Sequence, residues 1–247
     1  MPSIEAPLWI YEASDRPSRE GDYLAVIATF IYAGADLLDD LQDEDSFDRW
    51  KGFSKADLSL VATTFLSALP WKILSEMKIP LRRRLLLQKT LASKLLRMSE
   101  GQERDLNLPR RGESSDEAIC RSVEAKSGEE MGLFTLLPAQ MACFSKSRQR
   151  LCDHLGQMIG TASQLASDFN DLSSIKNKRY TAFLVEFYCQ RAMQVLRQLR
   201  FPSQVTQKFN RRIESISLFN KASSPTTQGG FHARQHRTKD RQGVGKR

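Results

Sequence analysis

The stretch ADLLDDLQDED, residues 35–45, follows the apolar run YLAVIATFIYAG and places six carboxylates within about three helical turns. Asp36, Asp40 and Asp43 are spaced i, i+4 and i+7, and Asp39 forms an i, i+4 pair with Asp43. Side chains at this spacing share one helix face, where like charges repel one another. The pattern therefore indicates either a helix that ends in solvent or a surface that receives strong positive charge.

A second acidic helix face is present in GQMIGTASQLASDFNDL, residues 156–172, where Gln164, Asp168 and Asp171 are again spaced i, i+4 and i+7. The same segment carries small residues that allow a neighbouring helix or a ligand to approach closely: Gly156, Gly160, Ala162 and Ser163. Helical bundles build core metal sites from carboxylates on facing helices. Oxygen ligands without His or Cys favour Mg²⁺ or Mn²⁺, and Mg²⁺ shares its coordination with water and substrate phosphates. The two faces together predict a diphosphate held through Mg²⁺.

Apolar residues recur at helical spacing along most of the chain, and the alternating runs typical of strands are missing. Turn-forming segments at Pro80, residues 108–117 and residues 173–179 separate seven or eight expected helices, and KGFSKAD, residues 51–57, is a plausible cap before one of them. No linker is long enough to divide two domains. We therefore expect one all-α helical bundle over residues 1–220.

The apolar run LSLVATTFLSALPWKIL, residues 58–74, is short, carries Ser and Thr, and is broken by Pro70. A membrane-spanning helix needs about 20 predominantly apolar residues. We therefore expect a buried helix here and no membrane span.

The formal net charge of +8 is concentrated in the C-terminal segment. Residues 221–247 contain seven Lys or Arg and one Asp, so the rest of the chain carries only +2. Because this segment is rich in Gly, Ser, Thr and Gln, we expect a basic disordered tail whose contacts with nucleic acid are at most weak. Four cysteines without a CxxC pair, and only three histidines, argue against a zinc site. With no signal-peptide pattern at the N-terminus, we expect free thiols and a cytoplasmic location.

Three further elements follow the first acidic face in order: GQERD at residues 101–105, KSG at residues 126–128 and the basic turn KNK at residues 176–178. Each alone has an ordinary structural reading, as a helix-packing glycine, a surface lysine or a solvated loop. Together with the two acidic faces, and in this order, they resemble the trans-isoprenyl diphosphate synthases, also called polyprenyl synthetases. The resemblance extends from about Tyr23 to Leu199.

The resemblance implies an isoprenoid synthase bundle with a central diphosphate cavity, usually as a homodimer. It implies Mg²⁺ ligands at the aspartates of both motifs: Asp39, Asp40, Asp43, Asp168 and Asp171. It implies catalytic roles for Lys126, which would bind diphosphate, for Ser127, which would face the carbocation, and for Gln164. It implies substrate binding by the other polar residues of the matched motifs: Arg49, Lys51, Gln102, Asp105 and Lys178, with Lys176 as the alternative to Lys178.

Three departures from the family pattern bear on function. Ser167 stands where the family has the first aspartate of the second motif, and DRWKG at residues 48–52 only approximates an arginine pair. The Gly-Lys-Arg-x-Arg-Pro element that grips isopentenyl diphosphate is absent before the first motif. Gly34 and Ala35, the fifth and fourth residues before that motif, are small, which predicts a deep pocket and substrates longer than geranyl diphosphate.

Three functions fit this pattern. The first is an Mg²⁺-dependent prenyltransferase that ionises an allylic prenyl diphosphate and transfers the prenyl group to isopentenyl diphosphate or another acceptor. The second is a terpene synthase-like enzyme that cyclises or quenches a single prenyl diphosphate. The third is a non-catalytic partner subunit of a heteromeric synthase. An allylic diphosphate ionises when cations neutralise the departing diphosphate in a water-excluded cavity, and the acceptor of the prenyl group then decides the outcome.

Overall fold

The computed structural model describes residues 2–14, 19–42, 50–108, 110, 112, 115–170 and 178–222. All regular secondary structure in these ranges is helical, which confirms the all-α prediction. The α-helices are α1 (Pro2–Glu12), α2 (Arg19–Gln42), α3 (Lys55–Thr63), α4 (Leu69–Glu76), α5 (Leu81–Asn107), α6 (Asp116–Val123), α7 (Glu129–Met141), α8 (Lys146–Asn170), α9 (Lys178–Leu199) and α10 (Ser203–Ala222).

Two π-helical turns make some of these helices continuous. The turn η2 (Thr64–Ala68) joins α3 to α4, and η3 (Glu124–Gly128) joins α6 to α7, with right-handed helical backbone at each junction. The described residues therefore form eight continuous helical rods, within the expected seven or eight. π-helical turns occur frequently at functional sites, and η3 contains Lys126 and Ser127.

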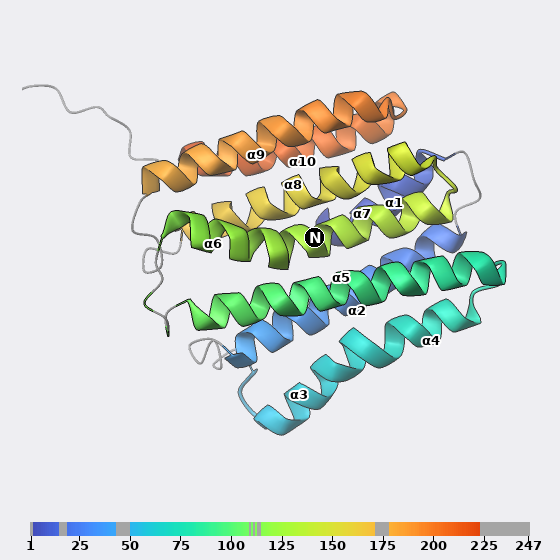
Figure 1. The fold of residues 1–247 in the computed structure, drawn as a ribbon, viewed down its shortest axis with the longest axis horizontal. Helices are drawn as coiled ribbons and strands as arrows, with labels where there is room; N and C mark the ends of the chain where they lie inside the picture. The colour runs from blue at the N-terminus through green and yellow to red at the C-terminus, as the bar shows by residue number, and fades with distance from the viewer. Residues whose placement is uncertain are drawn as a thin grey trace, which may run out of the picture.

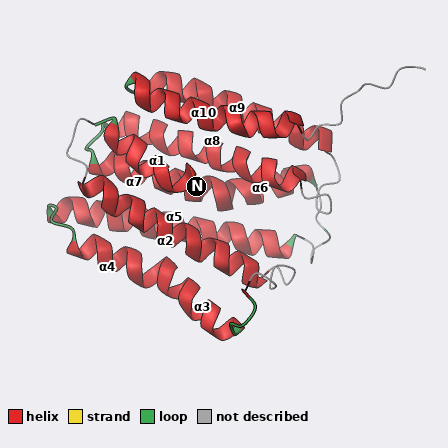
Figure 2. Cartoon of the chain, turned by 180° about the vertical axis from the view of Figure 1, so that it is seen from behind, coloured by secondary structure: helices red, strands yellow, loops and turns green. Residues whose placement is uncertain are grey.

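The rods lie side by side with their axes roughly aligned, and α7 occupies the centre of the bundle (Figures 1 and 2). It packs against α8, α5, α1 and α2, so neighbours cover it on every side. Eleven of its thirteen residues are buried. A helix buried all round needs no polar face, which explains why EEMGLFTLLPAQM lacks a clear amphipathic pattern after its first turn.

The helix boundaries follow the turn signals in the sequence. Ser54 caps α3 by accepting a hydrogen bond from the Asp57 backbone N–H at 3.1 Å, which confirms the expected cap. Pro80 immediately precedes α5, and Ser115 caps α6 through the Ala118 N–H at 3.2 Å. All four cysteines are free thiols, and only Cys143 is exposed. α10 extends to Ala222, and the rest of the predicted basic tail lies outside the described residues.

The prediction of a buried helix at residues 58–74 is confirmed only in part: the segment is helical and Leu58, Ala62 and Leu74 are buried, but one face is exposed. Leu60 is 69% exposed and Val61 39% exposed, because the α3–α4 rod lies at the edge of the bundle and contacts it mainly through α2 (Figure 1). The helical stretch Lys55–Glu76 is long and apolar enough to cross a membrane by length and composition alone, and it is the one such stretch in the described ranges. A single stretch of this kind is weak evidence for a membrane span.

Candidate active site

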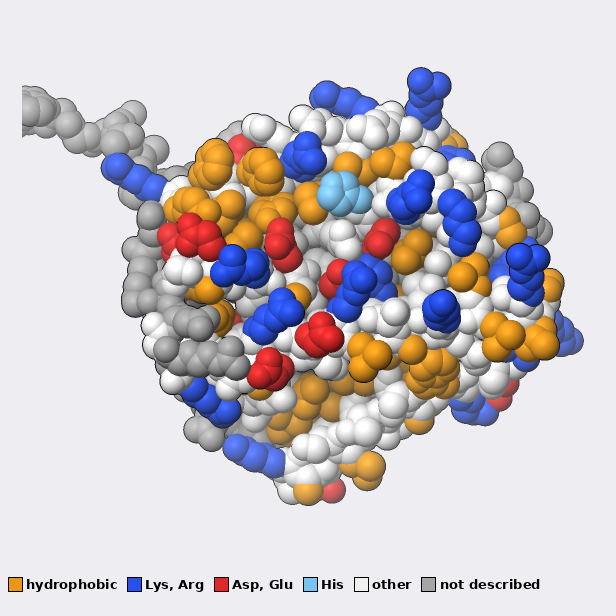
Figure 3. All heavy atoms as spheres, viewed as in Figure 1, with side chains coloured by type: hydrophobic (Ala, Val, Ile, Leu, Met, Phe, Trp, Pro, Cys, Tyr) orange, Lys and Arg blue, Asp and Glu red, His pale blue; other side chains and the backbone are white. Residues whose placement is uncertain are grey.

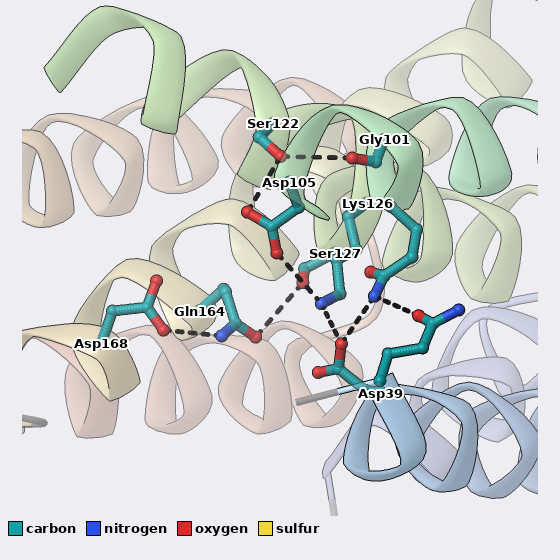
Figure 4. A network of polar contacts seen from close by, with 10 residues as sticks. Asp39, Gly101, Asp105, Ser122, Lys126, Ser127, Gln164 and Asp168 are labelled. Atoms are coloured by element: carbon teal, nitrogen blue, oxygen red, sulfur yellow. Dashed lines mark hydrogen bonds and ion pairs between the residues drawn. The ribbon is translucent and has the colours of Figure 1, made fainter. Parts of the chain in front are cut away.

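Four helical segments bring the predicted site residues together at one end of the bundle (Figure 1). They are the C-terminal parts of α2, α5 and α8 and the turn η3, which lies between them. Figure 4 shows Asp39 and Asp105 beside Lys126, and Asp168 connected to Ser127 through Gln164. The first acidic face, the second acidic face and the lysine element, separated by up to 129 residues in the chain from Asp39 to Asp168, thus share one site.

Lys126 connects the first acidic face to α5. Its Nζ lies 2.6 Å from Asp39 Oδ1 and 3.5 Å from Asp105 Oδ2. Asp39 Oδ1 also accepts a hydrogen bond from Gln102 Nε2 at 2.9 Å. Carboxylates of α2 and α5 therefore converge on a cation. Of the two interpretations of the acidic stretch, the structure favours a surface that receives positive charge over a helix that ends in solvent.

A glycine sets this geometry. A Cβ on Gly101 would lie 2.6 Å from the backbone of Ala125 and Lys126, so any side chain there would push η3 away from α5. Ser122 stabilises the contact between α6 and α5, because its hydroxyl donates to the Gly101 carbonyl and to Asp105 Oδ1, both at 3.2 Å. The glycine therefore permits close approach of a neighbouring helix, and that approach carries Lys126 to the carboxylates.

Ser127 connects the same turn to the second acidic face. Its Oγ donates to Gln164 Oε1 at 3.2 Å, and Gln164 Nε2 donates to Asp168 Oδ1 at 2.7 Å (Figure 4). A Cβ on Gly160 would overlap the Ser127 carbonyl oxygen, so the small residues of α8 admit the backbone of η3 and α7. The small residues could admit either a neighbouring helix or a ligand, and at Gly156 and Gly160 the structure shows a neighbouring helix.

The carboxyl groups of the two faces influence one another. Desolvation by burial raises the pKa of Asp168 to about 6, and the nearby charges of Asp105 and Asp39 raise it further, while the Gln164 hydrogen bond and Lys126 lower it. Ionisation of Asp168 is therefore less favourable than ionisation of an exposed aspartate, and a bound cation would favour it. The two acidic faces line one polar region rather than pointing apart into solvent.

A hard divalent cation fits the chemistry of these donors. Carboxylate and amide oxygens are what Mg²⁺ prefers, and Gln102 Oε1 is buried beside Asp39 without a donor in the described structure. Among the described residues, no group of three or more His, Cys, Asp or Glu is close enough to hold a metal ion. Asp43 and Asp171, which the resemblance adds to the ligand set, lie outside the described residues.

The remaining predicted residues are less closely tied to this centre. Asp40 Oδ2 accepts a hydrogen bond from Trp50 Nε1 at 2.7 Å, and Lys51 is exposed in the turn before α3. Arg49 and Lys176 lie outside the described residues, as does the side chain of Lys178. Their roles stay predictions.

An apolar cavity of about 330 Å³ opens beside Asp39 and Lys126 between α2, η2 and α5. Its apolar walls come from Ala35, Leu38, Leu66, Leu95 and Met98. Ala35 therefore lines this cavity, as expected if a small residue before the first aspartate motif leaves room for a deep pocket. Gly34 differs, because a Cβ there would lie 2.9 Å from the side chains of Phe65 and Leu66, so its small size serves helix packing.

Two charged residues near the site were missed at the level of sequence. Glu130 follows Lys126 by one helical turn, and burial raises its pKa to about 8, with Lys126 lowering it and Asp36 and Asp39 raising it. The i, i+4 spacing from Lys126 could have indicated it. Arg212 reaches the opposite side of Gln164 from α10, and no sequence motif marks it.

Comparison with solved structures identifies the fold of the helical bundle. The chain superimposes on a geranylgeranyl pyrophosphate synthetase from the archaeon Geoglobus acetivorans with a TM-score of 0.76 at 17% identity, covering 87% of this chain and 84% of that one. The chain has the isoprenoid synthase fold. This confirms the fold implied by the resemblance to polyprenyl synthetases.

Two further structures with this isoprenoid synthase fold agree. A polyprenyl synthetase from Streptomyces coelicolor A3(2) gives a TM-score of 0.74 at 15% identity, covering 87% of this chain and 84% of that one. A geranyltransferase from Legionella pneumophila gives 0.74 at 19% identity, covering 89% and 83%. No family model and no curated protein matches the sequence. Apart from the short motifs described above, the isoprenoid synthase likeness therefore rests on three-dimensional structure.

Proposed function

We propose that this protein is a Mg²⁺-dependent prenyltransferase that ionises an allylic prenyl diphosphate and transfers the prenyl group to an acceptor. The observation that carries the proposal is the polar network in which Lys126 and Ser127 connect Asp39 to Asp168 (Figure 4). The apolar cavity beside Asp39 and Lys126 supports it, because a prenyl diphosphate has one highly charged end and one apolar end.

Each residue of the network has a distinct role in this proposal. Asp39 and Asp168, with Asp40, Asp43 and Asp171 from the sequence motifs, would hold Mg²⁺, which supplies positive charge to the departing diphosphate. Lys126 adds a cation on the same side, and Gln102 orients Asp39. Ser127 and Gln164 position Asp168. The walls around Ala35 hold the prenyl chain away from water.

Incubation with Mg²⁺ and farnesyl or geranylgeranyl diphosphate, with and without isopentenyl diphosphate, tests the function. We expect a longer prenyl diphosphate only when isopentenyl diphosphate is present, with one pyrophosphate released for each isopentenyl diphosphate consumed. Hydrocarbon or alcohol products without isopentenyl diphosphate would instead identify a terpene synthase-like enzyme. Complete absence of turnover under all these conditions, alone and with a partner synthase subunit, would contradict the proposed activity.

Replacing Ala35 with phenylalanine is expected to shorten the accepted substrate, because the larger side chain would fill the apolar cavity next to Asp39. The kcat/KM for geranylgeranyl diphosphate should fall by about 10-fold or more relative to that for geranyl diphosphate, in line with the effect of a few methylenes in an apolar pocket. Val26→Phe, at a 44% exposed position on the same helix, is the control and should leave the ratio unchanged. An unchanged ratio in Ala35→Phe would exclude this cavity as the prenyl site.

The protein acts as a homodimer in this proposal, through apolar side chains exposed along the α3–α5 side. Figure 3 shows hydrophobic side chains gathered over α4 and α5. Large apolar residues that are exposed on these neighbouring helices are Leu60 and Val61 of α3 and Leu81, Leu85 and Leu96 of α5. Large exposed apolar patches on soluble proteins commonly mark interaction sites. On α5 the three leucines fall at helical spacing on one face.

The double substitution Leu85→Glu with Leu96→Glu is expected to convert the dimer to a monomer, because two buried charges per subunit would have to be desolvated. Size-exclusion chromatography with light scattering gives the mass directly. Leu218→Glu, at a 64% exposed position on α10, is the control and should stay dimeric. A monomeric wild-type protein at tens of micromolar would refute the dimer.

A further inference from the structure

Positive charge gathers at the end of the bundle opposite the polar network of Asp39 and Lys126. The segments 77–89 and 141–152, around the turns from α4 to α5 and from α7 to α8, contain eight Lys or Arg and no Asp or Glu. These cations are Lys78, Arg82, Arg83, Arg84, Lys89, Lys146, Arg148 and Arg150. Figure 3 shows Lys and Arg side chains over the parts of α5 and α8 nearest these turns. We call this surface the basic end.

The two turns of the basic end lie side by side. Arg83 Nη2 donates to Cys143 Sγ at 2.7 Å, which joins the start of α5 to the turn before α8. The Arg148 guanidinium lies 4.1 Å from the centre of the Phe144 ring, so it is held against the same turn. Five of the eight cations are exposed to solvent: Lys78, Arg82, Lys89, Lys146 and Arg150. The segments therefore form one surface from which most of the cations can reach a partner.

No carboxylate of the described residues forms an ion pair with any of these eight cations. The two carboxylates that flank the segments in sequence are paired elsewhere. Glu76 pairs with Lys72 one turn before it, and Asp153 pairs with the buried Lys94. The positive charge of the basic end is therefore not neutralised within the part of the chain that the structure describes.

This charge is a local feature and not part of a general excess of cations. Residues 1–220 carry a net charge of +2, so without the eight cations of the basic end they would carry −6. The carboxylates of the polar network, among them Asp39, Asp105 and Asp168, lie at the opposite end of the bundle. Opposite charges separated in this way orient a protein in the field of a charged surface. An anionic surface would therefore attract the basic end and leave the polar network facing away from it.

Exposed apolar side chains adjoin the cations. Leu81 is 65% exposed and lies between Lys78 and Arg82 in the sequence, and Leu85, 55% exposed, follows one helical turn later. Binding to a membrane interface increases with buried apolar area and with attraction to anionic lipids, so cations beside leucines suit such an interface. A nucleic-acid backbone offers phosphates but no apolar layer for these leucines. Leu81 and Leu85 also begin the apolar face of α5 assigned to the dimer, so the two surfaces meet there.

We propose that the basic end binds the surface of an anionic phospholipid membrane, with the protein lying on the membrane and not spanning it. The inference goes beyond the proposed prenyl transfer and does not depend on it, because no residue of the polar network takes part. Lys and Arg close to an anionic lipid surface are attracted to it within about a Debye length, so the binding weakens as salt is added. The N-terminal ends of α5 and α8 would face the lipid headgroups.

Co-sedimentation of the full-length protein with vesicles of phosphatidylcholine containing about 30% phosphatidylglycerol tests the proposal, with pure phosphatidylcholine vesicles as the neutral reference. The triple substitution Arg82→Ser, Lys146→Ser and Arg150→Ser removes three exposed cations of the basic end. We expect it to lower the partition coefficient at least 10-fold, because each cation near an anionic surface contributes up to about 5-fold. The wild-type partition coefficient should itself fall steeply between low and high salt.

The matched control is the triple substitution Arg179→Ser, Arg191→Ser and Arg211→Ser, which removes the same charge from exposed positions of α9 and α10. We expect this control to keep most of the wild-type binding. An equal loss in both triple variants would show that net charge alone governs binding and would overturn the assigned surface. Circular dichroism melting of both variants should match the wild type, since the substituted side chains are exposed.

Three other results would overturn the proposal. Equal binding by wild-type protein and the basic-end variant would assign any membrane affinity to the basic C-terminal segment, which every variant keeps. Equal wild-type binding to neutral and anionic vesicles would remove the electrostatic attraction. Tighter binding to a nucleic-acid duplex than to vesicles at the same salt concentration, lost in the basic-end variant, would assign this surface to nucleic acid.

Discussion

Replacing Asp39 with asparagine is expected to lower the turnover of a prenyl diphosphate by about 1,000-fold, the upper range for removing one group that stabilises developing charge. Asp39 Oδ1 is the atom on which Lys126 and Gln102 converge, at 2.6 and 2.9 Å. The amide keeps the shape of the side chain but removes the negative charge that holds Lys126 and contributes to cation binding. Pyrophosphate release from the allylic substrate measures the effect.

The control for this variant is Asp22→Asn, which changes an exposed aspartate in the first turn of the same helix. We expect full activity there, since Asp22 lies at the opposite end of α2. The melting temperature of Asp39→Asn should stay close to that of wild type, because the Asp39 side chain is 33% exposed and partly exposed ion pairs contribute little to stability. An Asp39→Asn protein with more than a tenth of wild-type turnover would remove Asp39 from the reaction.

Replacing Gly160 with alanine is expected to destabilise the protein by about 3 kcal/mol, at the upper end of what overpacking usually costs. A Cβ there would overlap the Ser127 carbonyl oxygen and lie 2.7 Å from Met131 Cβ, and a backbone atom on the central helical rod cannot move aside as a flexible side chain can. For a chain of this size, the melting temperature should fall by about 6–12 °C. Thermal unfolding followed by circular dichroism measures it.

The same substitution should also separate Ser127 from Gln164, because η3 and α8 would have to move apart. Ser147→Ala, at an exposed position of α8, serves as control and should melt like the wild type. If Gly160→Ala melted like wild type as well, the close contact of η3 with α8 would not contribute to the fold.

The sequence alone determined the helical class and most helix boundaries. Helical spacing, caps and turn residues act over a few residues, so Ser54 and Pro80 could be interpreted without knowing what each helix contacts. The two acidic faces could also be read, because i, i+4 and i+7 spacing places carboxylates together on any helix. The order of the motifs, through the resemblance, then predicted that the two faces meet with Lys126 and Ser127 between them.

Burial and convergence were decided by tertiary structure. The run at residues 58–74 is apolar enough for a core, yet Leu60 is exposed, because burial depends on which neighbour covers a face and the α3–α4 rod lies at the edge of the bundle. Arg212 reaches Ser163 from a helix 49 residues away, a contact that no local pattern encodes. The pKa of Glu130 likewise follows from its surroundings, since the same residue in solvent would ionise normally. The spacing of side chains along a helix is a local property and can be predicted from the sequence. The desolvation and charge environment of each side chain depend on the elements packed around it.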